Sequence, residues 1–225
     1  MPVGSEMVPI AISGPVWFIG IDAVLEAVSG VIALLIVLAC FRYAKLAKDN
    51  RYAPLGWGFL LLFLGFIAQL TTSFAIWQRV KEGVLQNIVE ITELAYVGHA
   101  AYVLLTISGL IVLALWALRI KEHLHVALVV ALALFLAIIG ITSQPVVLLL
   151  SVTLLAFVCL RFYMNACEQN TAGAWEVLVG FMLILGSQLA LLLAPISNQW
   201  YVGGYVAHVI GYLVLLGVLA QVVRK

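Results

Sequence analysis

Two four-residue motifs hold the side chains best suited to chemistry. Tyr96-Val97-Gly98-His99 lies in one long apolar stretch, and Tyr205-Val206-Ala207-His208 lies in the last one. Both motifs read Tyr-Val-small-His, and their histidines are the only two inside long apolar runs. A neutral imidazole ligates iron or zinc and titrates near physiological pH. The repeated position therefore predicts one site that both rings share at a common depth.

The first candidate for that site is haem b. Two imidazoles that face one another across a helix bundle can bind one iron from opposite sides. The small residues beside the histidines would leave room for a flat macrocycle, and the tyrosines would flank it. The expected cofactor-binding residues are His99, His208, Tyr96, Tyr205, Gly98 and Ala207.

A second group of polar residues is expected at a similar depth. Asp22 and Glu26 lie four apart and so share one helix face. An ionisable residue within hydrocarbon costs about 2.5–3.5 kcal/mol on insertion scales, so Glu26 should face the bundle and have a partner. The polar network is expected to contain Asp22, Gln69, Glu93 and Gln188.

Three further interpretations of these residues stay open. His99 and His208 with Glu26 (or Glu93) would offer two nitrogens and one oxygen to a zinc or iron ion. A buried hydrogen-bonded network of the same side chains would fix helix packing without any cofactor. A pocket in which His and Glu titrate would serve transport or sensing.

Composition sets the class of protein. Only 9% of the 225 residues are charged, against about 25% in a soluble domain. So few charges cannot cover a soluble globule, which predicts an integral membrane protein surrounded by the lipid bilayer. The charges form no basic stripe, which argues against nucleic acid as a partner. The three cysteines show no CxxC spacing and predict neither a disulfide framework nor a thiolate zinc site.

Seven apolar stretches come close to the roughly 20 residues that a spanning helix needs. Lysine and arginine gather on one side of the expected helices, which puts the N-terminus outside and the C-terminus in the cytoplasm. The expected location is the cell membrane, with a multi-pass chain. The predicted helices cover about residues 16–42, 55–78, 92–118, 124–142, 145–164, 174–195 and 201–222.

An internal repeat is also expected. Residues 40–43 and 159–162 both read Cys-x-Arg-aromatic, Gly-Phe recurs in the second and sixth helices, and the histidine motif recurs in the third and seventh. An odd number of linking helices makes such copies parallel. The sequence predicts an all-α seven-transmembrane-helix bundle with a 3+1+3 parallel repeat. Residues 1–225 would form one domain, with copies at about 16–118 and 145–222 and a linker helix at about 124–142.

The predicted topology resembles that of microbial rhodopsins and seven-helix receptors. A retinal pigment of the rhodopsin type needs a lysine in its last helix, and residues 201–222 contain none, so retinal is not expected. The layout also resembles SWEET-type sugar transporters, whose helices carry interior prolines that permit rocking. Pro54, Pro145 and Pro195 lie at helix ends here, which predicts a stiff bundle.

The function expected first is a small membrane cytochrome b-like protein or electron-transfer subunit, with His99 and His208 as axial ligands. Its partners would be a quinone or a membrane-protein partner subunit. The alternative is a non-enzymatic sensor or scaffold subunit built around a buried His/Glu network or metal site. The sequence does not decide whether the protein is an enzyme.

Overall fold

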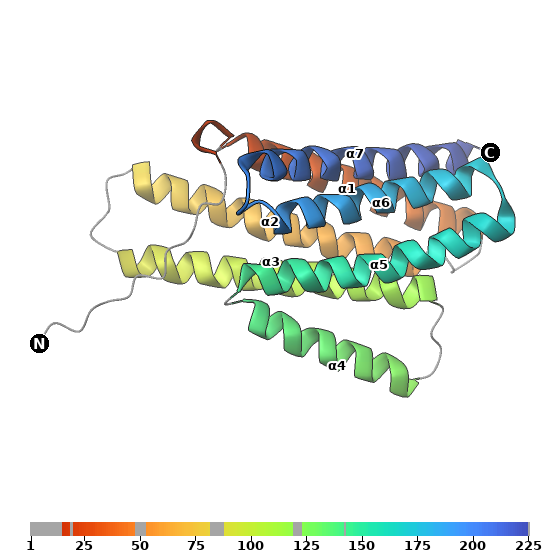
Figure 1. Cartoon of the computed structure of the whole chain (residues 1–225), viewed down its shortest axis with the longest axis horizontal. Helices are drawn as coiled ribbons and strands as arrows, with labels where there is room; N and C mark the ends of the chain where they lie inside the picture. The colour runs from red at the N-terminus through yellow and green to blue at the C-terminus, as the bar shows by residue number, and fades with distance from the viewer. Residues whose placement is uncertain are drawn as a thin grey trace, which may run out of the picture.

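A computed structural model describes residues 15–18, 20–47, 53–81, 88–118, 123–141 and 143–224. Within these ranges the chain is all-α, as predicted (Figure 1). A short 3-10 turn, Val16–Phe18, precedes the helices. The helices are α1 (Ile21–Ala47), α2 (Ala53–Lys81), α3 (Ile88–Leu118), α4 (His123–Gly140), α5 (Gln144–Gln169), α6 (Ala172–Leu192) and α7 (Asn198–Arg224).

Six of these helices are long and apolar enough to cross a membrane, namely all except α4. In α4 the described apolar part is Val130–Gly140, which is shorter than a span. The chain is therefore a helical bundle of membrane-protein type, and the seventh span stays a prediction. The inter-helix segments 48–52 and 119–122 lie outside the described residues, and with them Lys48, Arg51, Arg119 and Lys121.

Local chemistry explains where the helices begin and end. The first helix starts at Ile21, later than predicted, because Gly20 adopts a positive φ of 97° that breaks the chain direction. Asp22 then caps the start, since its Oδ1 accepts hydrogen bonds of 2.8 Å from the backbone N–H groups of Gly20 and Ala23. Pro145 occupies the first turn of α5, as predicted. Asn170 ends that helix in the left-handed region with a φ of 47°.

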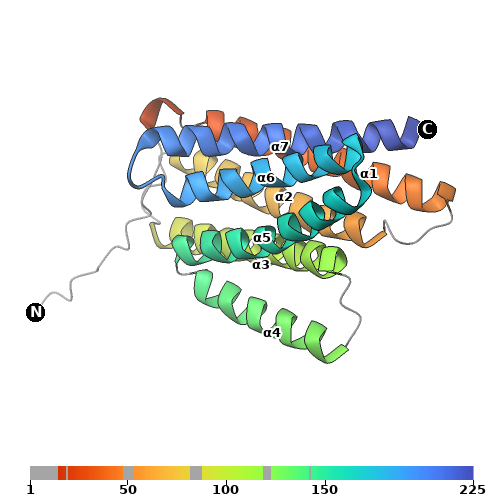
Figure 2. The same ribbon diagram turned by 45° about the vertical axis from the view of Figure 1, so that its right-hand side comes forward.

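The helices form a closed ring with one helix outside it. In the order α1, α2, α3, α5, α6 and α7, each helix contacts the next, and α7 contacts α1 again. The remaining helix, α4, contacts α3 and α5 and lies at one side of the bundle in both ribbon views (Figures 1 and 2). Because consecutive helices run in opposite directions, α1, α3, α5 and α7 all begin at the same end (Figure 1). We call this the N-terminal end of the bundle.

Two helix pairs cross at facing glycines. A Cβ on Gly109 would lie 2.8 Å from the carbonyl oxygen of Gly58, which joins α3 to α2. A Cβ on Gly211 would lie 2.9 Å from the carbonyl oxygen of Gly180, which joins α7 to α6. Neither position has room for a side chain. Close backbone approach of this kind maximises van der Waals contact, which drives helix association where lipid is as apolar as the helices.

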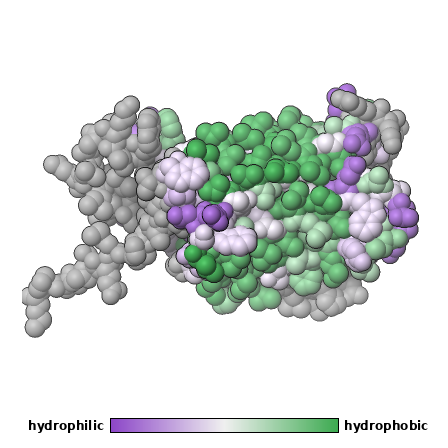
Figure 3. Space-filling model, turned by 45° about the horizontal axis from the view of Figure 1, so that its top comes forward, coloured by the Kyte–Doolittle hydropathy of each residue, from purple (hydrophilic) through white to green (hydrophobic). Residues whose placement is uncertain are grey.

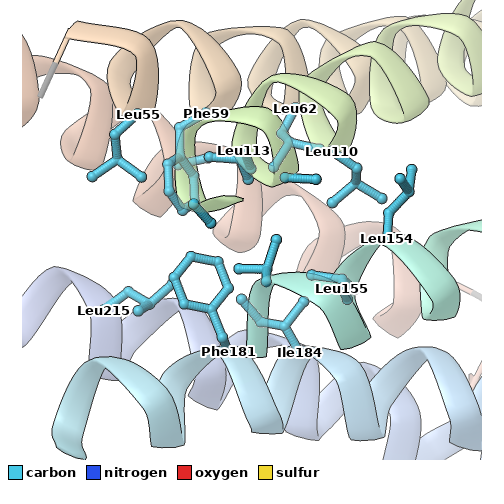
Figure 4. Close-up of a cluster of buried hydrophobic side chains, with 14 of the residues drawn as sticks. Leu55, Phe59, Leu62, Leu110, Leu113, Leu154, Leu155, Phe181, Ile184 and Leu215 are labelled. Carbon is cyan, nitrogen blue, oxygen red and sulfur yellow. The ribbon is translucent and has the colours of Figure 1, made fainter. Parts of the chain in front are cut away.

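Both glycine crossings lie at the same level of the bundle. Phe59, Phe181 and Tyr212 each directly follow a crossing glycine. The Phe59 ring centroid is 6.5 Å from that of Phe181 and 6.0 Å from that of Tyr212. Figure 4 shows the two phenylalanines facing each other between the helix pairs. The aromatic layer therefore fixes the depth of one crossing against the other.

The outer surface of the bundle is apolar. Figure 3 shows a broad hydrophobic band on one face, with polar residues toward its two ends. Large apolar side chains point outward along the helices, among them Leu132 and Phe135 of α4, which are 62% and 61% exposed. A patch of this extent is untenable in water and fits contact with a lipid bilayer.

The glycine crossing gives a direct test of the fold. Gly211→Ala should lower the free energy of unfolding by about 1–3 kcal/mol, because the new methyl group would press on the Gly180 carbonyl. Gly217→Ala is the matched control on the same helix, since a Cβ there meets nothing within 4 Å. Thermal unfolding of both variants in detergent measures the difference. Equal stability of the two variants would contradict the crossing.

Candidate functional site

Two tyrosine–carboxylate pairs join the first helix to the last. The Tyr201 hydroxyl donates to Asp22 Oδ2 at 3.1 Å, and the Tyr205 hydroxyl donates to Glu26 Oε1 at 3.1 Å. Each pair is 179 residues apart in sequence, so α1 and α7 run side by side in constant register. Both pairs are half-buried at the N-terminal end of the bundle, with Glu26 one turn deeper. We call this contact the α1–α7 seam.

An aromatic lid covers the shallow end of the seam. Phe18, in the 3-10 turn before α1, is only 3% exposed. Its ring centroid lies 5.9 Å from that of Tyr201 and 6.1 Å from that of Tyr205. The turn that delays the start of α1 thus places an apolar ring over the two tyrosines, which limits the access of solvent to their hydrogen bonds.

His208 lies on the same stripe of α7 as these tyrosines and bonds to the neighbouring helix. Its Nδ1 is 2.9 Å from Ser187 Oγ. Ser187 already donates its one hydroxyl hydrogen to the Ile184 carbonyl at 2.6 Å. It can therefore only accept from His208, which assigns the proton of the neutral ring to Nδ1 and leaves Nε2 as an acceptor. The ring packs against Phe66 and Tyr212, with centroid distances of 5.9 and 4.9 Å.

One tyrosine of α3 reaches the same interior. The Tyr102 side chain lies near Thr106 on its own helix and near Glu26 of α1. It also lies near Tyr205 and Tyr212. The polar interior is thus formed by α1, α3, α6 and α7, and its acidic group is Glu26.

The other histidine has a different setting. His99 is half-buried, and its ring lies 6.2 Å from that of Tyr102 between centroids. The expected room beside Gly98 is taken, because Thr72 of α2 packs directly onto that glycine. Tyr96 is 54% exposed and is therefore not the structural counterpart of Tyr205 on α7. The two motifs match in sequence but have different surroundings.

The histidines also lie at different levels. His99 is ten residues before Gly109, whereas His208 is three residues before Gly211. Since the two glycine crossings share one level, the seven-residue difference corresponds to about 10 Å along the helices at about 1.5 Å per residue. The packing register therefore separates the rings by about two turns, instead of placing them at the common depth that the motif predicts.

The predicted zinc or iron ligands are not assembled. Within the described part of the chain, no group of three His, Cys, Asp or Glu side chains is placed to hold a metal ion. This applies to the predicted set of His99, His208 and Glu26, all of which are described. The alternative ligand Glu93 is exposed near the start of α3.

The remaining predicted residues are distributed around the bundle. Gln69 and Gln188 are half-buried on α2 and α6, and Ala207 is half-buried beside His208. Sequence reasoning included neither Ser187 nor Tyr201 in the site. The matching four-residue spacings of Asp22/Glu26 and Tyr201/Tyr205 were the available signal, since each spacing puts two polar groups on one helix face.

No protein-family model, curated protein or solved structure matches this chain.

The seam predicts unequal roles for the two motif tyrosines. Tyr205→Phe should lower the free energy of unfolding by about 1–2 kcal/mol, because it leaves Glu26 without its hydroxyl donor. Tyr96→Phe is the matched control and should change it by less than about 0.5 kcal/mol, as expected for an exposed side chain. Thermal unfolding in lipid nanodiscs measures both. A larger loss in Tyr96→Phe than in Tyr205→Phe would refute this assignment.

Proposed function

We propose that this protein is a non-enzymatic membrane sensor module in which the protonation state of Glu26 sets the α1–α7 seam. The observation that carries the proposal is the hydrogen bond of 3.1 Å between Tyr205 and Glu26 inside a membrane-spanning segment. A carboxyl group in that position costs free energy, and intramembrane ionisable residues commonly mark function.

The surroundings of Glu26 support a responsive role. Its carboxyl accepts a hydrogen bond from Tyr205 and lies near the Asp22 carboxyl, and no cation is among the described residues that interact with it. A carboxylate without a counter-charge is not locked in its ionised form. Its charge-assisted bond from Tyr205 becomes an ordinary neutral bond when a proton binds, which weakens the seam.

The position of the seam supports transmission of that change. The contact between α1 and α7 closes the helical ring, and both helices run from the N-terminal end of the bundle to its opposite end. A shift of α1 against α7 at Glu26 therefore reaches the far ends of both helices. The loops are too short to hold a catalytic domain, so the signal would pass to a membrane-protein partner subunit.

The orientation of the bundle in the membrane is also part of the proposal. We propose that the N-terminal end of the bundle faces the outside of the cell membrane, on the basis of the Lys and Arg distribution. Glu26 would then sense the external pH.

The paired crossings Gly58/Gly109 and Gly180/Gly211 support a duplicated three-helix unit with α4 as the linker. In that repeat the glycines, and not the histidines, are the equivalent positions of α3 and α7.

A haem-binding electron-transfer subunit with a quinone partner is the second candidate. The observation that favours it is the His208 tautomer, since an Nδ1–H bonded to Ser187 is the arrangement that presents Nε2 to a metal. The two-turn offset of His99 from His208 is the reason that this candidate comes second.

The pH response of Glu26 can be observed directly. Infrared difference spectra of the protein in lipid vesicles, recorded between two pH values, should contain a buried carboxyl band. Glu26→Gln should remove that band, whereas Glu93→Gln, at an exposed position, should leave it in place. A spectrum that Glu26→Gln leaves unchanged would rule out the proposed sensor role of this residue.

The absorption spectrum of the purified protein tests haem binding. The sensor proposal expects purified protein without a Soret band, before or after reduction with dithionite. A Soret band that sharpens on reduction and is lost in His208→Ala would favour the cytochrome over the sensor. A band that persists in His208→Ala would exclude His208 as the ligand.

A further inference from the structure

Ser29 is a buried hydroxyl whose bonding is incomplete. It is 1% exposed, and its Oγ has no hydrogen-bond partner among the described residues. Serine and threonine hydroxyls in helices usually satisfy themselves by turning back to a carbonyl three or four residues earlier. Thr71, Thr72 and Thr153 do so here, and so does Ser187. The Ser29 hydroxyl does not, which leaves a polar group in the core that calls for an explanation.

The register of the seam places Ser29 beside His208. The two hydrogen-bonded pairs of the seam have a separation of 179 residues, and Ser29 and His208 are also 179 apart (208 − 29). Contacts with α2 agree with this level. The ring of His208 packs on Phe66 at 5.9 Å, and a Cβ on Gly30, the residue after Ser29, would lie 3.4 Å from the same Phe66. Ser29 and His208 therefore form the third step of the seam.

Ser29 and His208 have complementary hydrogen-bonding groups that are not used in other bonds. Because Nδ1 of His208 donates to Ser187, its Nε2 is an acceptor, and no described residue donates to it. Ser29 offers a hydroxyl donor and two acceptor lone pairs, none of them used within the described chain. The two groups do not bond directly, so a molecule that both accepts and donates would satisfy both. Water is the smallest molecule with that chemistry.

We propose that one buried water molecule binds between Ser29 and His208. The Ser29 hydroxyl donates to the water oxygen, and the water donates one hydrogen to His208 Nε2. Its second hydrogen points along α1 to Glu26, which lies one turn closer to the N-terminal end. Buried waters typically make about three hydrogen bonds to otherwise unsatisfied polar groups, which this arrangement supplies.

The water extends the responsive network from the seam into α6. The connected groups are Glu26 on α1, the water, His208 on α7 and Ser187 on α6. A change at Glu26 then alters the hydrogen bonding of His208. This inference deepens the proposed function and rests on it for that consequence, whereas the water site itself depends on Ser29 and His208 alone.

Ser29→Ala distinguishes a hydrated site from a dry one by the sign of the change in melting temperature. If the hydroxyl binds water that is shared with His208, its removal should lower the melting temperature in nanodiscs. If the hydroxyl is a bare group in a dry core, its removal should leave the melting temperature unchanged or raise it, because an unsatisfied group disappears. Thr153→Ala, an exposed position on α5, is the control for loss of a hydroxyl elsewhere in the bundle.

A second measurement detects the water itself. In solid-state NMR of 15N-histidine-labelled protein in lipid vesicles, magnetisation should pass from water to Nε2 of His208, with His208→Asn used for assignment. The transfer should be lost or several-fold slower in Ser29→Ala. Absence of transfer in the wild-type protein would overturn the proposal, whatever the melting temperatures show. That outcome would leave the Glu26 infrared band intact, so failure of the water site and failure of the sensor function are distinguishable.

Discussion

A carboxyl group held within the apolar part of a membrane bundle is the constraint on which the rest of this structure depends. Glu26 can be placed there because Tyr205 donates a hydrogen bond to it from the adjacent helix. That single requirement aligns α1 with α7, and the same register brings Asp22 to Tyr201 one turn closer to the surface. It also brings Ser29 level with His208 one turn deeper. The contact that closes the ring of helices is therefore polar at its N-terminal end.

The glycine crossings provide the rigid frame for this seam. Gly109 on Gly58 and Gly211 on Gly180 fix each inner helix pair at close range. The aromatic layer around Phe59 holds the two pairs at one level. Because this frame is rigid, local rearrangement can accommodate little of a change in the hydrogen bonding of Glu26. Such a change is expected to move α1 and α7 relative to one another, as the proposed sensor role requires.

Much of the fold could be predicted from the sequence, because long apolar stretches and few charges leave little choice except membrane-spanning helices. The start of α1 was displaced by the positive φ of Gly20, which a hydropathy pattern does not contain. In the site, Glu26 was correctly expected to need a partner, and the partner is a tyrosine of one histidine motif. The resemblance between the motifs suggested equal depth for His99 and His208. Depth is set by the glycine crossings, however, and their contacts become visible only when the helices are packed.

The central claim, that Glu26 and Tyr205 stabilise one another across the seam, is tested most directly by a double-mutant cycle. Unfolding free energies would be measured in nanodiscs for the wild-type protein, Glu26→Gln, Tyr205→Phe and the double variant. We predict a coupling energy of about 1 kcal/mol or more, because each single change removes the same charge-assisted bond. Strictly additive effects would contradict it and would mean that the two side chains act independently.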